Sequence, residues 1–125
     1  MKKVILSKNA PAAIGPYSQA IESNGTLYIS GQIPINPATG KIVEGGIKEQ
    51  TEQVMKNIEA ILTAAGYVFD DVVKSTCLLS EISNFASMNE VYASRYKINP
   101  PARAAFAVKD LPLGCLVEIE TIATK

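Results

Sequence analysis

The chain contains no histidine and only two cysteines among its 125 residues. Without histidine it can form no Ser-His-Asp triad, no Cys-His pair and no site with a histidine metal ligand. Cys77 and Cys115 lie far apart in apolar surroundings and form no CxxC motif. We therefore interpret both as small core residues with reduced thiols, which is typical of an intracellular protein.

The chain also lacks net charge, because 12 basic residues balance 12 acidic ones. Nucleic-acid binding draws much of its affinity from clustered Lys and Arg. Here Lys2 and Lys3 are the only adjacent basic pair, so a nucleic-acid partner is disfavoured. No apolar run approaches the ~20 residues that span a bilayer. The basic N-terminus soon becomes polar and is too short for a signal peptide. We expect a cytoplasmic protein without membrane contact.

What is present indicates one domain covering residues 1–125. The apolar content is 47% and the charged content 19%, values that support a folded core. Strand-like segments are bounded by turn residues such as Asn24-Gly25, a strong hairpin signal. The early strands are expected at Val4–Leu6, Tyr17–Glu22, Thr26–Ser30, Ile33–Ile35 and Lys41–Val43, and the later ones at Val72–Leu79, Ala102–Val108 and Leu116–Ala123.

Two segments have helical periodicity. From Ile47 to Ala65 apolar residues recur at spacings of three and four, and Gly66 is well placed to end this helix. A second helix is expected from about Asn84 to Tyr96, ended by Asn99-Pro100-Pro101. This order of elements predicts an α+β sandwich with both helices on one face of the sheet.

The last strand has a clear alternation. Val117, Ile119 and Thr121 point one way, and we assign the first two to the helix-packed core. Glu118 and Glu120 point the other way, together with apolar Leu116 and Ile122. A mixed sheet face without helices to cover it indicates a subunit interface, so we expect an oligomer.

The richest segment for chemistry is Pro100–Glu120. Arg103 lies among small alanines, and its planar fork suits bidentate binding of a carboxylate. Glu118 or Glu120, expected on a neighbouring strand, could hold a water or move a proton. The pattern therefore indicates a possible site for a small carboxylic acid. A surface ion pair for Arg103 and a solvated edge for the two glutamates remain open.

Other candidates carry weaker signals. Gly31, between Ser30 and Gln32, would by default form a β-bulge, but a glycine would also let a ligand reach the bare backbone. Tyr17 could pack or could face a pocket. Asn89 is an unusual polar neighbour of the apolar stripe that contains Phe85 and Tyr92 on the second predicted helix. We expect it to cap or bridge backbone rather than bind a substrate.

Several motifs together resemble the RidA/YjgF family of reactive intermediate (imine) deaminases. They extend over the whole chain in one order: APAAIGPYSQ at 10–19, SGQIP at 30–34, PPAR at 100–103 and VEIETIA at 117–123. The segments Gln50–Gly66 and Phe85–Tyr92 also match in spacing. The resemblance implies a chorismate-mutase-like sandwich, a six-stranded mixed sheet with two helices on one face. It also implies a homotrimer with clefts between adjacent subunits.

The activity implied by the resemblance is the hydrolysis of short 2-imino acids to 2-keto acids and ammonia, without cofactor or metal. By motif, Arg103 would clamp the substrate carboxylate and Glu118 would activate the attacking water, with Glu120 as the fallback. Backbone at Gly31 and Ala105 would orient the ligand, and Tyr17 and Ser30 would line the cleft. Asn89 matches a family position near the cleft.

Position 105 is often cysteine in this family and is alanine here, which argues against a thiol-dependent activity. Two other functions stay open. The same cleft could bind a 2-keto acid without turnover, as a regulatory module. An RNA-directed role, as a translation inhibitor or endoribonuclease, is also described in the family, but the balanced charge and missing histidine disfavour it.

Overall fold

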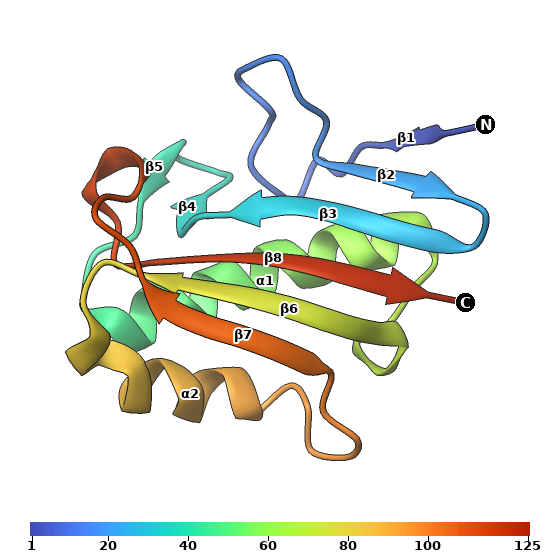
Figure 1. Ribbon diagram of the computed structural model, residues 1–125. Helices are drawn as coiled ribbons and strands as arrows, with labels where there is room; N and C mark the ends of the chain where they lie inside the picture. Colours follow the sequence, from blue (N-terminus) through green and yellow to red (C-terminus); the bar gives the residue numbers. More distant parts are fainter.

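In the computed structural model, which describes residues 1–125, six strands form one mixed sheet and two helices pack against it (Figure 1). The sheet order is β1-β2-β3-β8-β6-β7, and only β6 and β7 run parallel. A separate hairpin contains β4 and β5. The strands are β1 (Lys3–Ile5), β2 (Ala20–Ser23), β3 (Thr26–Gln32), β4 (Ile35–Asn36), β5 (Lys41–Ile42), β6 (Val72–Leu79), β7 (Ala102–Ala107) and β8 (Val117–Thr124).

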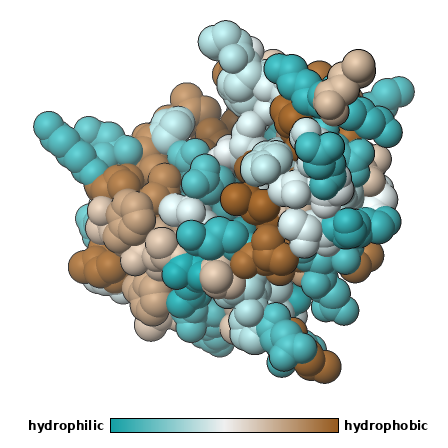
Figure 2. Space-filling view, turned by 45° about the vertical axis from the view of Figure 1, so that its right-hand side comes forward, coloured by the Kyte–Doolittle hydropathy of each residue, from teal (hydrophilic) through white to brown (hydrophobic).

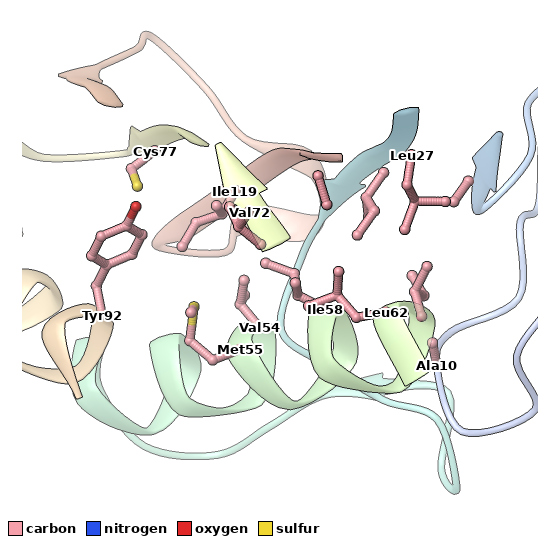
Figure 3. Packing of buried hydrophobic residues seen from close by; sticks show 14 of the residues in the cluster. Ala10, Leu27, Val54, Met55, Ile58, Leu62, Val72, Cys77, Tyr92 and Ile119 are labelled. Carbon is pink, nitrogen blue, oxygen red and sulfur yellow. The ribbon is translucent and has the colours of Figure 1, made fainter. Parts of the chain in front are cut away.

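Helix α1 (Ile47–Ala65) has the predicted bounds and buries its apolar stripe against the sheet. Val54, Ile58 and Leu62 project from it toward residues such as Leu27 and Ile119 (Figure 3). The helix ends at Gly66, whose φ of 81° lies in the left-handed region that favours glycine. The predicted α+β architecture with a helix-covered face is therefore confirmed.

Helix α2 (Phe85–Ala93) is shorter than predicted. Residues 94–96 continue the turn, but each amide bonds the carbonyl three residues back, as Tyr96 N does to Ala93 O at 3.1 Å. These bonds are typical of a 3₁₀ turn, so the α-helix ends before Tyr96. The apolar stripe nevertheless continues to Tyr96, which is buried. The spacing of apolar residues does not distinguish an α-helix from a 3₁₀ turn at a helix end.

The first predicted strands are displaced by a few residues. Strand β2 begins at Ala20 rather than Tyr17, because the preceding loop is organised by the buried Gln19 side chain. Its Oε1 accepts from the Ser7 amide at 2.7 Å, and its Nε2 donates to the Pro11 carbonyl at 2.8 Å. These bonds close the 7–19 loop on itself, and the Ser30 amide of β3 donates to the Gln19 carbonyl at 3.0 Å, which joins the loop to the sheet. Tyr17 is left outside the sheet.

Alternation along β8 is as predicted. Val117, Ile119 and Thr121 are buried on the helix side, whereas Glu118 and Glu120 point to the open face. This open face also contains Tyr28 and Ile122, which are paired in register across β3 and β8. In Figure 2, apolar groups lie in patches beside hydrophilic ones. Both cysteines are free and buried, and no helix is long and apolar enough to cross a membrane.

The hairpin β4–β5 is fixed to α1 by a buried asparagine. Asn57 is fully buried, and its Nδ2 donates to the carbonyls of Ile33 and Ile35 at 3.2 and 3.0 Å. Both carbonyls belong to the segment that follows the end of β3. One side chain thus positions the chain as it leaves the sheet.

We expect Asn57→Ala to lower the free energy of unfolding by about 3 kcal/mol, because two buried carbonyls lose their donor. Denaturant unfolding of Asn57→Ala beside Lys56→Ala, a change at the exposed neighbouring position, measures this effect. A loss below about 1 kcal/mol would show that the asparagine is not the anchor of the hairpin.

Candidate active site

Arg103 is held against helix α2 by three side chains. Its Nη1 donates to Asn89 Oδ1 at 2.6 Å. Its Cζ lies 4.9 Å from the ring centroid of Tyr92 and 5.4 Å from that of Phe85. Cation–π contacts of this kind attract a guanidinium to the ring faces. The expectation that Asn89 caps or bridges backbone is wrong, because its carbonyl oxygen accepts from Arg103.

Phe85, Asn89 and Tyr92 are spaced i, i+4 and i+7 and so share one helix face. The sequence pattern places Asn89 beside the apolar stripe that contains Phe85 and Tyr92, but it does not connect the two aromatics with Arg103. Their shared face with Asn89 was the signal that could have revealed the connection. A helix face that carries two aromatic rings and an amide can hold the guanidinium of an arginine on a neighbouring strand.

A hollow of about 410 Å³ opens beside this arginine. It is lined by Asn89, Tyr92, Ala93, Tyr96, Pro100, Pro101 and Arg103. Asn89 engages one N–H group of a guanidinium that has five. The remaining groups can bind a carboxylate in the bidentate manner. The geometry makes Arg103 a pre-oriented anion receptor at the edge of the sheet.

Glu118 lies on the open face, directly over Gly31. A Cβ built on Gly31 would collide with Glu118 Oε2 and would lie 3.0 Å from its Cδ. Gly31 sits in the predicted bulge, where the register between β3 and β8 shifts from Ile29 to Gln32. Burial, and secondarily the nearby Glu120 carboxylate, raises the pKa of Glu118 above its ordinary value. A raised pKa brings a carboxylate closer to the range of an effective general base.

The other predicted residues lie at different places. Ser30 is beside the bulge, and its hydroxyl donates to the Ser18 carbonyl at 2.6 Å, so only its lone pairs remain for a ligand. Glu120 is exposed, two residues along the same face as Glu118. Tyr17 is half-exposed in the loop before β2. Ala105 pairs with Cys77 in register and shares the face of Arg103.

The expectation that Arg103 and Glu118 lie on neighbouring strands is wrong. Strand β6 separates β7 from β8. The chain crosses through α2 to place β7 parallel to β6 at the edge, and β8 then enters between β6 and β3 (Figure 1). Sequence order gave no indication of this insertion.

The two groups also occupy opposite faces of the sheet. Arg103 pairs in register with Ser75, which is buried on the helix side. Glu118 pairs in register with Leu78. Ser75 and Leu78 are three residues apart on β6, so their side chains point to opposite faces of the sheet. Within one chain, therefore, the arginine and the carboxylate do not face each other. The chain also gathers no group of three or more Cys, Asp or Glu side chains that could hold a metal ion.

Comparison with known proteins agrees with this arrangement of motifs. The family described as endoribonuclease L-PSP, which comprises the YjgF/RidA proteins, matches residues 7–125. This chain belongs to the RidA/YjgF family. The predicted family resemblance is thus confirmed over nearly the whole length.

Individual RidA/YjgF relatives are similar along their full chains. A RutC family protein of Pyrococcus horikoshii is 56% identical, over 100% of this chain and 99% of the relative. The 2-iminobutanoate/2-iminopropanoate deaminase of Mus musculus is 48% identical, over 100% of this chain and 93% of the relative. A crystal structure of a Rid family protein from Yersinia pestis superposes with a TM-score of 0.96 at 54% identity, covering both chains completely.

Gly31→Ala should lower the free energy of unfolding by about 1–2 kcal/mol, because the new methyl group displaces the Glu118 carboxylate. In a Glu118→Ala background the same change should cost less than about 0.5 kcal/mol, since the clashing atoms are gone. A double-mutant cycle by denaturant unfolding measures this coupling. Equal costs in both backgrounds would disprove the contact as the reason for glycine.

Proposed function

We propose that this protein hydrolyses short 2-imino acids, of the 2-iminobutanoate and 2-iminopropanoate type, to 2-keto acids and ammonia. The observation that carries the proposal is the pre-oriented Arg103, whose free N–H groups suit the carboxylate common to these substrates. Relatives named for this activity are about half identical to the chain along its full length. Such imines form from enamines such as 2-aminoacrylate, so the proposed role is removal of reactive metabolites.

The reaction needs few groups, because a protonated imine is already electrophilic. Water adds to the imine carbon while Glu118 accepts its proton, giving a tetrahedral 2-amino-2-hydroxy acid. Glu118 returns this proton to nitrogen and then accepts the hydroxyl proton, so that the C–N bond breaks, ammonia leaves and the carbonyl forms. The ammonia takes up the proton held by Glu118 and departs as ammonium. The raised pKa of Glu118 suits this exchange. General base catalysis contributes roughly 10²–10⁴-fold, and the arginine clamp adds orientation without any cofactor.

The remaining residues would surround the substrate. Backbone at Gly31 and Ala105 would orient the ligand, and Ser30 would accept a hydrogen bond. Tyr17 would line the cleft, and Glu120 is the fallback acid, because it shares the face of Glu118. Asn89 has a clearer role, as the side chain that orients Arg103.

A complete site on these terms requires two copies of the chain. Arg103 and Glu118 occupy opposite faces of one sheet, so the arginine of one copy must meet the carboxylate of another. The open face that bears Glu118 also presents Tyr28 and Ile122. We propose a homotrimer of chorismate-mutase-like subunits, with sheets lining a central barrel and three sites between subunits, working in the cytoplasm.

Two rival functions differ in what they require. A 2-keto-acid-binding regulatory module would use Arg103 but has no turnover to lose when Glu118 changes to Gln. An endoribonuclease would act on a strongly anionic polymer, which a chain of zero net charge without histidine suits poorly. Imine hydrolysis remains the function that the Arg103 geometry supports best.

Arg103→Ala should reduce imine hydrolysis at least about 100-fold, because the carboxylate loses a bidentate charged partner. The assay generates 2-iminobutanoate from threonine with a dehydratase and traps residual imine with semicarbazide. Wild type at catalytic amounts should suppress trapping, and the alanine variant should not.

The Glu118→Gln variant is the companion measurement. It should lose rate while retaining 2-oxobutanoate binding. If the wild-type protein leaves trapping unchanged but binds 2-oxobutanoate, the enzyme proposal is wrong and the regulatory module is supported.

Mixing two inactive variants tests whether sites form between subunits. In co-assembled Arg103→Ala and Glu118→Ala chains, about one quarter of the sites should combine an intact arginine with an intact glutamate. We expect activity to recover to about that fraction of wild type after joint refolding. Separately refolded and then mixed proteins are the control. No recovery, with mixed oligomers verified by mass, would show that each site belongs to one chain.

A further inference from the structure

Beneath Arg103 the core contains a cluster of hydroxyl groups that the proposed reaction does not use. Ser75, Tyr92, Tyr96 and Thr121 are at most 7% exposed. None of their hydroxyls makes a hydrogen bond of ordinary length and angle within the chain. Buried hydroxyls without partners are costly, and native proteins usually satisfy them with a side chain or a water.

The four hydroxyl groups converge on Ser75. This residue pairs in register with Thr121 on β8 and with Arg103 on β7, so all three project from the helix-covered face of the sheet. The Ser75 hydroxyl also lies close enough to the phenols of Tyr92 and Tyr96 for a weak hydrogen-bond interaction with each. Burial dominates and raises the pKa of Tyr92 and of Tyr96, while Ser75 works in the opposite direction on each.

The cluster is neutral. Cys77 projects toward the Tyr92 hydroxyl from the same face of β6 (Figure 3). Burial raises the pKa of this thiol to about 11, against a smaller opposing effect of Arg103. Hydroxyls and a thiol that all keep their protons can donate and accept, but they provide no charge for an ion. Such a cluster suits a small neutral ligand that can both donate and accept hydrogen bonds, and water is the smallest such ligand.

Tyr92 joins this cluster to the proposed site. The centroid of its ring lies 4.9 Å from Arg103 Cζ and 4.8 Å from the centroid of the Tyr96 ring. Its hydroxyl end is buried in the cluster. Whatever fixes that hydroxyl also fixes the ring on which the guanidinium stacks.

We propose that Ser75, Tyr92, Tyr96 and Thr121 form an internal water site, and that the water held there makes Tyr92 a positioning residue for Arg103. The hydroxyl anchors one end of the ring, and the ring face sets the plane of the carboxylate clamp. The link to substrate rests on the proposed function, whereas the water site does not.

Tyr92→Phe and Ser75→Ala test the site, since each removes one hydroxyl and leaves the packing nearly unchanged. If the hydroxyls share a water, each variant should lower Tm by about 3–6 °C. Ser80→Ala is the matched control, because its hydroxyl is also buried without a partner but lies outside the cluster. Its Tm should stay constant or rise. A constant or higher Tm in Tyr92→Phe would overturn the proposal.

A crystal structure at about 1.5 Å resolution provides the direct observation. The expected result is a water within hydrogen-bond distance of Ser75 Oγ and at least one phenol. Direct bonds from the phenols to Ser75, with no water between them, would overturn the site even if Tm falls.

Steady-state kinetics of imine hydrolysis test whether Tyr92 positions Arg103. Tyr92→Phe should raise KM for the imine by about three- to tenfold with kcat nearly constant, because the clamp acts on ground state and transition state alike. Loss of folded protein alone would lower kcat and leave KM unchanged, which would refute the positioning role. If wild type has no deaminase activity, the proposed function fails, while Tm and the crystal structure still decide the water site.

Discussion

The position of β8 in the middle of the sheet is the constraint on which the other features depend. Its buried residues Val117, Ile119 and Thr121 join α1 to the sheet, and its intervening glutamates are thereby forced onto the opposite face. A shift of register by one residue would bury two carboxylates and expose the core. This energetic penalty fixes the register of β8 and therefore the position of Glu118. Because Glu118 lies over position 31, that position has no room for a side chain.

Arg103 obeys a different constraint, because β7 lies at the edge and is covered only by α2. There a charge can remain solvated while its guanidinium rests on two aromatic rings. The arrangement differs from a surface ion pair, since Asn89 orients the cation without neutralising it. The positive charge stays available, which is the property that a receptor for a small anion needs.

Local features of the fold could be predicted from sequence, because they depend on neighbouring residues. The bounds of α1, its glycine stop and the alternation along β8 all arise from short-range periodicity and backbone preference. Strand order could not be predicted in this way. The insertion of β8 between β3 and β6 depends on contacts between distant segments, and no local pattern encodes it. The same limit applies to Asn89, whose partner Arg103 is fourteen residues away in sequence.

The edge position of β7 has a consequence for the behaviour of the chain in solution. Strand β7 reads ARAAFA, and Arg103 is its only charged residue. A flat, uncharged strand with one unpaired side is a template for pairing with other chains, and a single cation is a common deterrent. Arg103 provides the one charge along this edge. A lysine at this position would retain that charge while losing the planar fork, and so separates solubility from recognition.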